Sequence, residues 1–324
     1  MNPNLELPWV EKYRPKKLNE VVGQKIIVQR LKEYVNSKNM PHMMFAGPAG
    51  CGKTSCAVAL AKEMYTDHLE QNFLELNASD TRGIDVVRGQ IKDFARTLAF
   101  NAQHKVIFLD EADSLTNDAQ HALRRTMEKY TKTARFILNV NYSSRIIEPI
   151  QSRCIVFRFS RLQETDLNQK LNEIAKAEQL ELDEKALKAI AYISDGDLRK
   201  ATNALQGASI LGKKISEESI FNVSSRAKPV EIKEMILLAL EQKFLDVRNR
   251  LDKLMLEHGM SGEDVMVQVY KETLDLDETI LDTKKKIELV NIIGEYNFRL
   301  VQGANERIQL EALMAQFMKF GNKS

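Results

Sequence analysis

Short apolar runs alternate with segments whose apolar residues recur every three or four positions over the first half of the chain. Continuous apolar runs of this length are typical of buried parallel strands, and the helical spacing is typical of amphipathic helices. The runs predict five strands, at Met43–Ala46, Phe73–Asn77, Lys105–Glu111, Arg135–Asn141 and Cys154–Phe159. The other segments predict helices, at Gln24–Ser37, Ser55–Tyr65, Ile84–Leu98 and Asn117–Tyr130. Together they predict an α/β domain with a parallel five-stranded sheet wrapped by helices on both sides.

The second half of the chain shows no further strand pattern. Helical spacing recurs at Thr165–Ala177, Asp183–Ile193 and Leu198–Leu211, and again from Val230 to Phe320. The polar stretch Ser224–Lys228, directly before Pro229, is the best candidate for a linker. These patterns predict three domains: the α/β domain over residues 1–160, a small helical domain over 161–226 and an all-α domain over 227–324.

The segment Leu7–Pro15 mixes apolar, aromatic and basic residues between two prolines. We expect no regular helix there, because proline interrupts helical hydrogen bonding. Its aromatic side chains indicate that the segment packs on the surface of the first domain.

The composition is that of an ordinary globular protein, with 44% hydrophobic and 28% charged residues among 324. Lys and Arg number 47 and Asp and Glu 45, so any nucleic-acid site must be a local patch. The cysteines, Cys51, Cys56 and Cys154, lack zinc-type pairs and are interpreted as reduced thiols, and the histidines show no metal-ligand spacing. Without a signal-peptide pattern or a membrane-spanning apolar run, the chain is expected to be cytoplasmic and to bind no membrane.

The stretch from Gly47 to Thr54 matches the phosphate-loop pattern. Glycines let successive backbone N–H groups point at phosphate oxygens, while Lys53 brings a compact positive charge and the Thr54 hydroxyl can hold Mg²⁺. A glycine-rich turn with a chance Lys-Thr pair is the alternative interpretation. The strand before the loop and the helix after it favour the phosphate loop, because the helix N-terminus then points at the phosphates. The first domain is therefore predicted to bind a nucleotide.

Further candidate residues follow the predicted strands, where ligands bind in open α/β sheets. Asp110 ends a buried strand, as Mg²⁺-organising carboxylates do in phosphate-loop enzymes, and Glu111 is placed to orient or deprotonate an attacking water. The alternative is a plain pair of helix N-terminal charges. Asn141 closes the next strand and could reach the γ-phosphate or the water, or could simply cap the strand.

Two arginines extend this picture. Arg153 lies on a loop just before the last predicted strand, a natural place for a charge that serves a neighbour's nucleotide, although a solvated surface arginine is the simpler reading. Arg199 is on the first turn of a helix in the small helical domain and could fold back over bound phosphates, which would make that domain a lid.

Six stretches carry a family resemblance: Trp9–Pro15, Gly47–Thr54, Leu76–Asp80, Asp110–Asp113, Glu148–Cys154 and Gly196–Arg199. With them the chain resembles the AAA+ ATPases and, within these, the small subunits of archaeal replication factor C, the sliding-clamp loaders. The resemblance covers essentially the whole chain and is dense to about residue 205. It implies an AAA+ phosphate-loop NTPase domain, a helical lid and an all-α collar that ties a ring of subunits together. It also implies ATP and Mg²⁺ as ligands and an ATP-dependent role in loading the clamp during replication, next to the nucleoid.

The resemblance also implies roles for individual residues. Asp110 and Thr54 would support Mg²⁺, and Glu111 would activate water. Asn141 and Arg199 would sense the γ-phosphate, Arg153 would act in trans as an arginine finger, and Arg124 and Arg125 would reach across the same interface. The adenine pocket would be lined by Val10, Arg14, Val22 and Gly23, and the triphosphate would be held by Gly47, Pro48, Ala49, Gly50, Cys51, Gly52, Lys53, Thr54 and Ser55. Cys51 departs from the threonine or valine common in the family, and its side chain is expected to point away from the phosphates.

Partners follow from the same resemblance: a large subunit and further small subunits in a pentamer, a sliding clamp, and primer–template DNA. The expected DNA surface comprises Arg82, Gly83, Ile84 and Arg88, at a helix start suited to phosphate, unless the arginines are merely solvated. Phe100 is a candidate plug for the clamp, with core packing as the alternative. Two other functions stay open: a structural subunit with an idle ATPase, and a different AAA+ machine on DNA, such as a branch-migration motor or a checkpoint loader.

Overall fold

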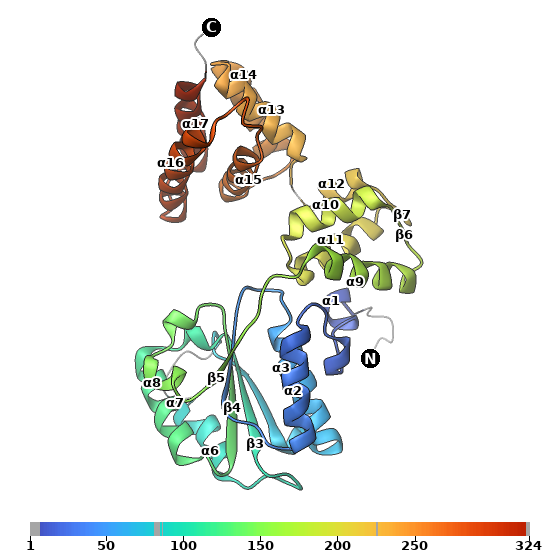
Figure 1. Ribbon diagram of the computed structural model, residues 1–324, viewed down its shortest axis with the longest axis vertical. Coiled ribbons are helices and arrows are strands. Elements are labelled where there is room, and N and C mark those ends of the chain that lie inside the picture. The colour runs from blue at the N-terminus through green and yellow to red at the C-terminus, as the bar shows by residue number, and fades with distance from the viewer. Residues whose placement is uncertain (1–6, 81–84, 86, 225, 322–324) are drawn as a thin grey trace. The chain divides into compact units, whose positions relative to one another are not determined.

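The computed structural model describes residues 7–80, 85, 87–224 and 226–321. The chain forms two compact units, residues 1–215 and 216–324 (Figure 1). This division falls earlier in the chain than the predicted start of the all-α domain at residue 227. The boundaries of the three predicted domains stay a prediction.

The first unit is built on the predicted five-stranded parallel sheet (Figure 1). The strands are β1 (Met43–Ala46), β2 (Phe73–Asn77), β3 (Lys105–Asp110), β4 (Ala134–Val140) and β5 (Ile155–Arg158). Their order is β2-β3-β4-β1-β5, and every pairing is parallel. The three inner strands are almost wholly buried, whereas β2 and β5 at the edges are partly exposed. Because all strands run the same way, their carboxyl ends share one edge of the sheet.

Alternate strand residues feed two hydrophobic cores, one on each face of the sheet. Phe45 and Phe108 belong to the core under α2 (Lys25–Ser37) and α3 (Lys53–Tyr65). Met44 belongs to the opposite core, which includes residues of the segment 87–96 and of α7. α7 spans Asn117–Lys129 and starts where the Thr116 side chain accepts the Ala119 N–H. Shorter elements complete this part of the chain: η1 (Leu18–Glu20), η2 (Thr66–His68), α4 (Leu69–Asn72), η4 (Ala112–Ser114), η5 (Ser143–Arg145) and α8 (Glu148–Gln151).

Two local expectations were wrong. The segment Leu7–Pro15 contains a single helical turn, α1 (Trp9–Lys12), because Pro8 precedes the turn, where its missing N–H costs nothing, and Pro15 lies beyond it. The helix predicted at 84–98 contains a π-helical turn, η3 (Val87–Ile91), followed by α6 (Lys92–Arg96). The chain is extended from Thr97, so Leu98 is 81% exposed. Residues 81–84 and 86 lie outside the described residues.

The sheet is followed by three helices, here called the lid helices: α9 (Glu164–Ala177), α10 (Glu184–Ser194) and α11 (Leu198–Ser209). Asp183 and Asp197 cap α10 and α11, each accepting a backbone N–H of the first turn. The expectation that no strand follows the sheet was wrong in detail, because β6 (Glu181–Leu182) and β7 (Lys214–Ile215) pair in parallel. At two residues each, they are too short to leave a sequence pattern.

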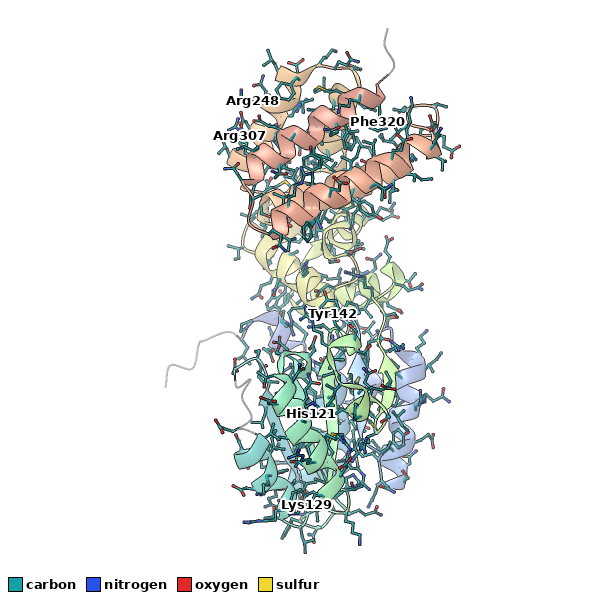
Figure 2. The ribbon with its side chains drawn as sticks, turned by 90° about the vertical axis from the view of Figure 1, so that its left-hand side faces the viewer. His121, Lys129, Tyr142, Arg248, Arg307 and Phe320 are labelled. Carbon is teal, nitrogen blue, oxygen red and sulfur yellow. The ribbon has the colours of Figure 1, made fainter. Side chains whose placement is uncertain are left out.

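The second unit is helical, as predicted for most of it. Its elements are α12 (Glu217–Ser224), α13 (Pro229–Leu240), α14 (Phe244–Asp252), η6 (Lys253–Glu257), α15 (Gly262–Leu274), α16 (Thr283–Val301), α17 (Glu306–Phe317) and η7 (Met318–Phe320). The buried amide of Gln268 joins α15 to the chain before α13, since it both donates to and accepts from the backbone of Ala227. Arg307 on α17 pairs with Asp252, and Figure 2 shows it beside Arg248. None of the helices in the described ranges is long and apolar enough to cross a membrane.

Candidate nucleotide-binding site

The loop between β1 and α3 has a backbone suited to phosphate. Gly50 and Gly52 have φ of 69° and 97°, in the left-handed region that glycine enters without strain. α3 begins directly after Gly52, at Lys53. The first N–H groups of a helix lack intrahelical acceptors, so the loop ends at a ready-made anion site.

The Lys53 ammonium lies inside this loop and is only 6% exposed. Its Nζ donates to the carbonyl oxygens of Gly47 and Pro48, both at 2.7 Å, and to Asn141 Oδ1 at 3.1 Å. Burial lowers the pKa of Lys53, while the nearby Asp110 carboxylate opposes the shift. The charge is thus held among oxygen acceptors at the place where a nucleotide phosphate would supply better ones.

A hydroxyl, a carboxylate and an amide meet at the carboxyl ends of β3 and β4. Thr54 Oγ1 donates to Asp110 Oδ2 at 3.0 Å, and Asn139 Nδ2 donates to Thr54 Oγ1 at 3.2 Å and to Asp110 Oδ1. Asn139 is 5% exposed, and its own Oδ1 is buried without a hydrogen-bond partner. Hydroxyl and carboxylate oxygens are ligands that Mg²⁺ prefers, so Thr54 and Asp110 fit that ion. Asn139 was not among the residues predicted for the site, although a polar residue inside an apolar strand was a visible signal.

Glu111 begins the turn after β3 with a left-handed φ of 51°. Non-glycine residues seldom adopt this conformation, and strained backbone of this kind clusters at functional sites. The Glu111 N–H donates to Asp110 Oδ1 at 2.9 Å, and the residue is exposed at the pocket described below. The turn therefore presents the Glu111 carboxylate to the site while Asp110 stays at the strand end.

Asp113 connects this turn to the end of β4. Its Oδ2 accepts the backbone N–H groups of Asn141 at 3.3 Å and of Tyr142 at 3.1 Å, while its Oδ1 is buried without a partner. Because the Asn141 side chain contacts Lys53, Asp113 fixes the backbone from which that contact is made. Asp113 was predicted only as part of the motif Asp110–Asp113, without a role of its own.

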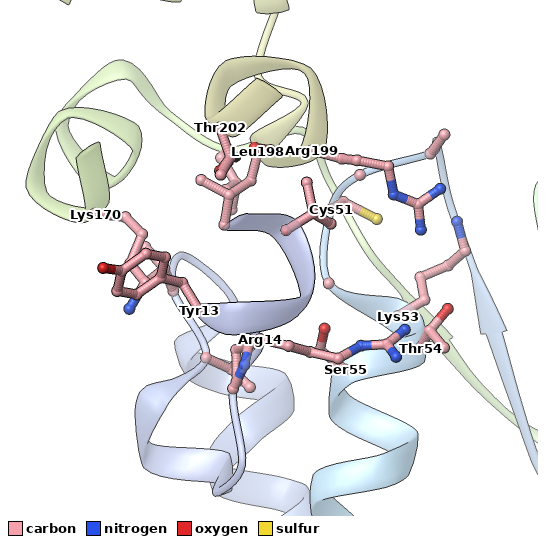
Figure 3. Close-up of a pocket in the computed structure, with 18 of the residues that line it drawn as sticks. Tyr13, Arg14, Cys51, Lys53, Thr54, Ser55, Lys170, Leu198, Arg199 and Thr202 are labelled. Atoms are coloured by element: carbon pink, nitrogen blue, oxygen red, sulfur yellow. Dashed lines mark hydrogen bonds between the residues drawn. The ribbon is translucent and has the colours of Figure 1, made fainter. Parts of the chain in front are cut away.

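A pocket opens beside the loop, and Figure 3 shows Tyr13 and Lys170 at one end of it and Lys53 and Arg199 at the other. The residues predicted for the site that line it are Val10, Arg14, Val22, Ala49, Gly50, Cys51, Gly52, Lys53, Thr54, Ser55, Asp110, Glu111, Asn141 and Arg199. Three predicted residues, Gly23, Gly47 and Pro48, are not among its lining residues. Lining residues that the sequence analysis missed include Trp9, Tyr13, Val21, Asn139, Leu162, Lys170, Ile174, Leu198 and Thr202. Cys51 is buried and donates its thiol hydrogen to the Pro48 carbonyl at 2.9 Å.

The N-terminal segment joins the pocket to the lid helices. The Trp9 N–H donates to Gln206 Oε1 on α11 at 3.0 Å, and the Trp9 side chain is 7% exposed. Lys12 Nζ donates to Glu178 Oε1, at the end of α9, at 2.6 Å, and the Tyr13 hydroxyl donates to the same oxygen. The segment that carries Val10 is therefore tied to the lid helices by these hydrogen bonds.

The first turn of α11 rests directly on the phosphate loop. The Leu198 N–H donates to the Gly50 carbonyl at 3.1 Å. A Cβ atom on Gly50 would lie 1.8 Å from Asp197 Oδ1, so only glycine leaves room for this helix end. Arg199 is the next residue of α11, and its side chain reaches toward the loop (Figure 3).

Arg153 does not line this pocket. Its Nη1 donates to the Pro149 carbonyl at 2.5 Å, and its Nη2 pairs with Glu128 Oε1 on α7. Arg124 Nε donates to the same Glu128 oxygen at 3.0 Å, whereas Arg125 lines a separate groove on α7. An arginine away from its own chain's nucleotide pocket is compatible with a role at a neighbour's pocket.

The residues predicted to bind DNA lie largely outside the described residues: Arg82, Gly83 and Ile84 are not described, and of Arg88 only the backbone is, in η3. Next to η3, a groove between α6 and α7 is lined by Lys92, His121, Arg125 and Lys129, among others. His121 and Lys129 are visible on α7 in Figure 2.

The candidate clamp plug Phe100 is 51% exposed, so its side chain is not a core residue. The buried side chain of Asn72 donates to the Phe100 carbonyl and accepts its N–H, both at 2.8 Å. The ring packs edge-on against His68. The loop thus holds an aromatic side chain partly in solvent on a fixed backbone.

Comparison with known proteins agrees with this geometry. Residues 43–162 match the family described as "ATPase family associated with various cellular activities (AAA)". Solved structures of the RuvB branch-migration motor of Thermotoga maritima share the fold, with a TM-score of 0.56 at 18% identity over 79% of this chain and 91% of that one. The fold and the site therefore define an AAA-type ATPase that binds a nucleotide.

The other matches are more specific. Residues 169–210 match the "RCF1/5-like, AAA+ ATPase lid domain", and residues 227–316 match the "Replication factor C C-terminal domain". A replication factor C small subunit of Methanococcus maripaludis is 54% identical over 313 residues, which cover 96% of this chain and 98% of that protein. Those of Methanothermobacter thermautotrophicus and Archaeoglobus fulgidus are 53% and 51% identical, over 96% and 99% of this chain and 98% and 99% of theirs.

The chain therefore belongs to the replication factor C small-subunit family, as the sequence motifs predicted. A member of this family is a subunit of a multi-subunit clamp loader. The likeness to RuvB is one of fold alone, so a branch-migration motor is not favoured.

Proposed function

We propose that this chain binds ATP with Mg²⁺, hydrolyses it, and couples the hydrolysis to loading a sliding clamp onto primer–template DNA. It would do so in a ring-like pentamer with a large subunit and further small subunits. The observation that supports this most is the meeting of Lys53, Thr54, Asp110 and Asn141 at one sheet edge, with α11 resting on the loop above them. This is the set of groups that phosphoryl transfer requires.

Each group has a defined task. Lys53 exchanges its carbonyl partners for phosphate oxygens, and its reduced solvation makes that exchange favourable. Thr54 and Asp110 hold Mg²⁺, which supplies positive charge against the charge that develops on the phosphoryl oxygens. Glu111 accepts the proton of the attacking water. Asn141, anchored through Asp113, orients that water or the γ-phosphate.

The lid completes the site. Arg199 contributes a second positive charge from the first turn of α11. Val22, together with Val10 and Arg14 of the N-terminal segment, encloses the purine. That segment is bound to the lid helices through Gln206 and Glu178. Nucleotide binding would therefore be linked to the position of the lid relative to the sheet.

Arg153 is proposed to act on the nucleotide of the adjacent subunit. A guanidinium there neutralises charge that builds in the transition state and has little effect on the ground state. Such fingers contribute about 10³ to 10⁵ in rate in the best-studied systems. DNA would be gripped through its phosphates by Arg82, Ile84 and Arg88, an interaction that is largely independent of sequence.

The experiment that tests the function is an ATPase measurement on the assembled complex, with and without primed DNA and the sliding clamp. We expect turnover to rise when both are present and to disappear in a complex that carries Lys53→Ala in every subunit of this chain. No turnover in the intact complex would identify an idle structural subunit. Full stimulation by DNA alone would identify a different DNA machine.

The trans role of Arg153 has its own test. Complexes of Lys53→Ala chains and of Arg153→Ala chains should each be nearly inactive. Mixed complexes should recover activity at interfaces that pair an intact phosphate loop with an intact Arg153. Well-assembled mixtures with no recovery would rule out a site shared between subunits.

A further inference from the structure

One carboxylate, Glu128, holds two arginines at the exposed end of α7. Its Oε1 accepts from Arg124 Nε at 3.0 Å, one helical turn earlier, and pairs with Arg153 Nη2 from the loop after α8. Arg153 Nη1 also donates to the Pro149 carbonyl at 2.5 Å. In Figure 1, α7 and α8 lie side by side. The guanidinium of Arg153 is thus fixed from two sides, by a side chain of α7 and by the backbone of α8.

This arrangement contributes little to stability. The side chains of Glu128, Arg124 and Arg153 are 38%, 40% and 34% exposed, and ion pairs at such positions are weak because water screens them. What it supplies is orientation. The two bonds occupy two of the five N–H donors of the Arg153 guanidinium, so donors remain for another anion.

The charges explain why a carboxylate is needed. Arg124 and Arg153 are like charges brought to one oxygen, and without Glu128 they would repel each other. The hydrogen bond from Arg124 lowers the pKa of Glu128, with Arg153 adding to the shift, so the carboxylate keeps its charge at neutral pH. A neutral amide in its place could still accept a hydrogen bond but could not offset the repulsion.

We propose that Glu128 is the positioning residue that holds Arg153 in the orientation from which it acts on the neighbouring subunit's nucleotide. This inference rests on the proposed trans role of Arg153. Glu128 lies on α7, and α7 follows the turn that carries Glu111 and Asp113. The residue that positions the finger is therefore on the helix next to the chain's own nucleotide site. Each subunit would then position its finger from the far end of the helix that follows its own catalytic turn.

A directional mixing experiment tests the proposal. In mixed complexes, a Lys53→Ala chain can only donate the finger and an Arg153→Ala chain can only hold the nucleotide. Glu128→Gln is added to one of the two chains at a time, and the recovered ATPase rate is measured at saturating ATP. On the donating chain it should lower the rate about 10-fold to 100-fold, the range expected when a catalytic group is misplaced. On the nucleotide-holding chain it should leave the rate nearly unchanged.

Further measurements separate positioning from structure. Glu128→Asp on the donating chain, which keeps the charge, should restore part of the rate, and neither Glu128 variant should change the unfolding temperature or the assembly. Equal losses from Glu128→Gln on either chain, or no loss on the donating chain, would overturn the proposal and leave Arg153 in its trans role. If the parent mixture of Lys53→Ala and Arg153→Ala chains recovers no activity, the trans role itself fails and this proposal with it.

Discussion

Two buried histidines predict how the first unit responds to acid. His42 is 8% exposed and its Nδ1 accepts the Phe136 N–H at 3.1 Å, and His104 is 2% exposed with its Nε2 lacking any hydrogen-bond partner. Burial, and to a smaller extent the positive charge of Arg135, lower the pKa of both side chains from 6.5 to about 4. None of these contacts pairs either ring with a carboxylate, which would favour protonation in the folded state.

The sign of the effect follows from proton binding. Below pH 6.5 the unfolded chain binds a proton on each histidine, while the folded chain stays neutral until the pH approaches 4. The stability that these groups contribute is therefore complete above 6.5 and is lost as the pH falls toward 4. At about 1.4 kcal/mol for each pKa unit, lowering the pH from 7 to 5 reduces the free energy of unfolding by about 2 kcal/mol for each histidine. The pair should cost about 3 to 4 kcal/mol, which is a large part of the stability of an ordinary domain.

The measurement is urea unfolding at pH 7 and at pH 5. Trp9 is the only tryptophan and is buried in the first unit, so its fluorescence reports on that unit, and circular dichroism must follow the same transition. The comparison is a double variant, His42→Gln with His104→Phe, which keeps an acceptor for Phe136 and a ring at 104 but cannot titrate. Between pH 7 and pH 5, the free energy of unfolding of the intact chain should fall by about 3 to 4 kcal/mol more than that of this variant. Equal losses would show that the histidines do not carry the acid response.

Three further predictions concern the site and its partners. Glu111→Gln should bind ATP·Mg²⁺ normally and hydrolyse it at least about a hundredfold more slowly, because an amide cannot take the proton of water, and normal turnover would remove Glu111 from this role. Asp113→Ala leaves the N–H groups of Asn141 and Tyr142 without their acceptor, so kcat should fall about tenfold at unchanged nucleotide affinity. An equal loss of affinity would instead indicate a general collapse of the loop. Phe100→Ala should weaken clamp binding without lowering the unfolding temperature, since the side chain is 51% exposed. Unchanged clamp binding would remove Phe100 as the plug, and a large drop in unfolding temperature would show that the ring stabilises the fold.

The features that depend on local residue patterns could be predicted from the sequence. The five strands were found because their apolar runs are continuous, and their carboxyl ends were known to share one edge once a parallel sheet was inferred. That inference places Lys53, Asp110, Glu111 and Asn141 in one predicted site from the sequence alone. The π-helical turn at Val87–Ile91 could not be predicted in this way, because it shifts the spacing of buried residues without any special residue type.

Residues that hold other side chains in place were harder to predict than those proposed to react. Asn139 lies inside β4, and its amide matters only because α3 brings the Thr54 hydroxyl to it from another part of the chain. Asp113 acts by accepting two backbone N–H groups. Such contacts cannot be predicted from residue types, because nearly every residue has a backbone N–H. In the sequence, Glu128 looks like an ordinary helix-surface residue four positions after Arg124. Its contact with Arg153 forms only when the chain folds.

The contact between Gly50 and Asp197 shows what such long-range packing adds to the chemistry. A glycine at position 50 is required by the loop for its left-handed φ and, independently, by the lid for the space that Asp197 fills. The hydrogen bond from the Leu198 N–H to the Gly50 carbonyl then ties the start of α11 to the backbone of the loop that is proposed to hold the phosphates. Any rearrangement of the loop around a triphosphate must therefore move α11 or break this bond, and α11 carries both Arg199 and the acceptor for Trp9. If the chain binds ATP as proposed, the loop, the lid and the pocket would respond together, which is the mechanical condition for coupling ATP hydrolysis to a change of shape.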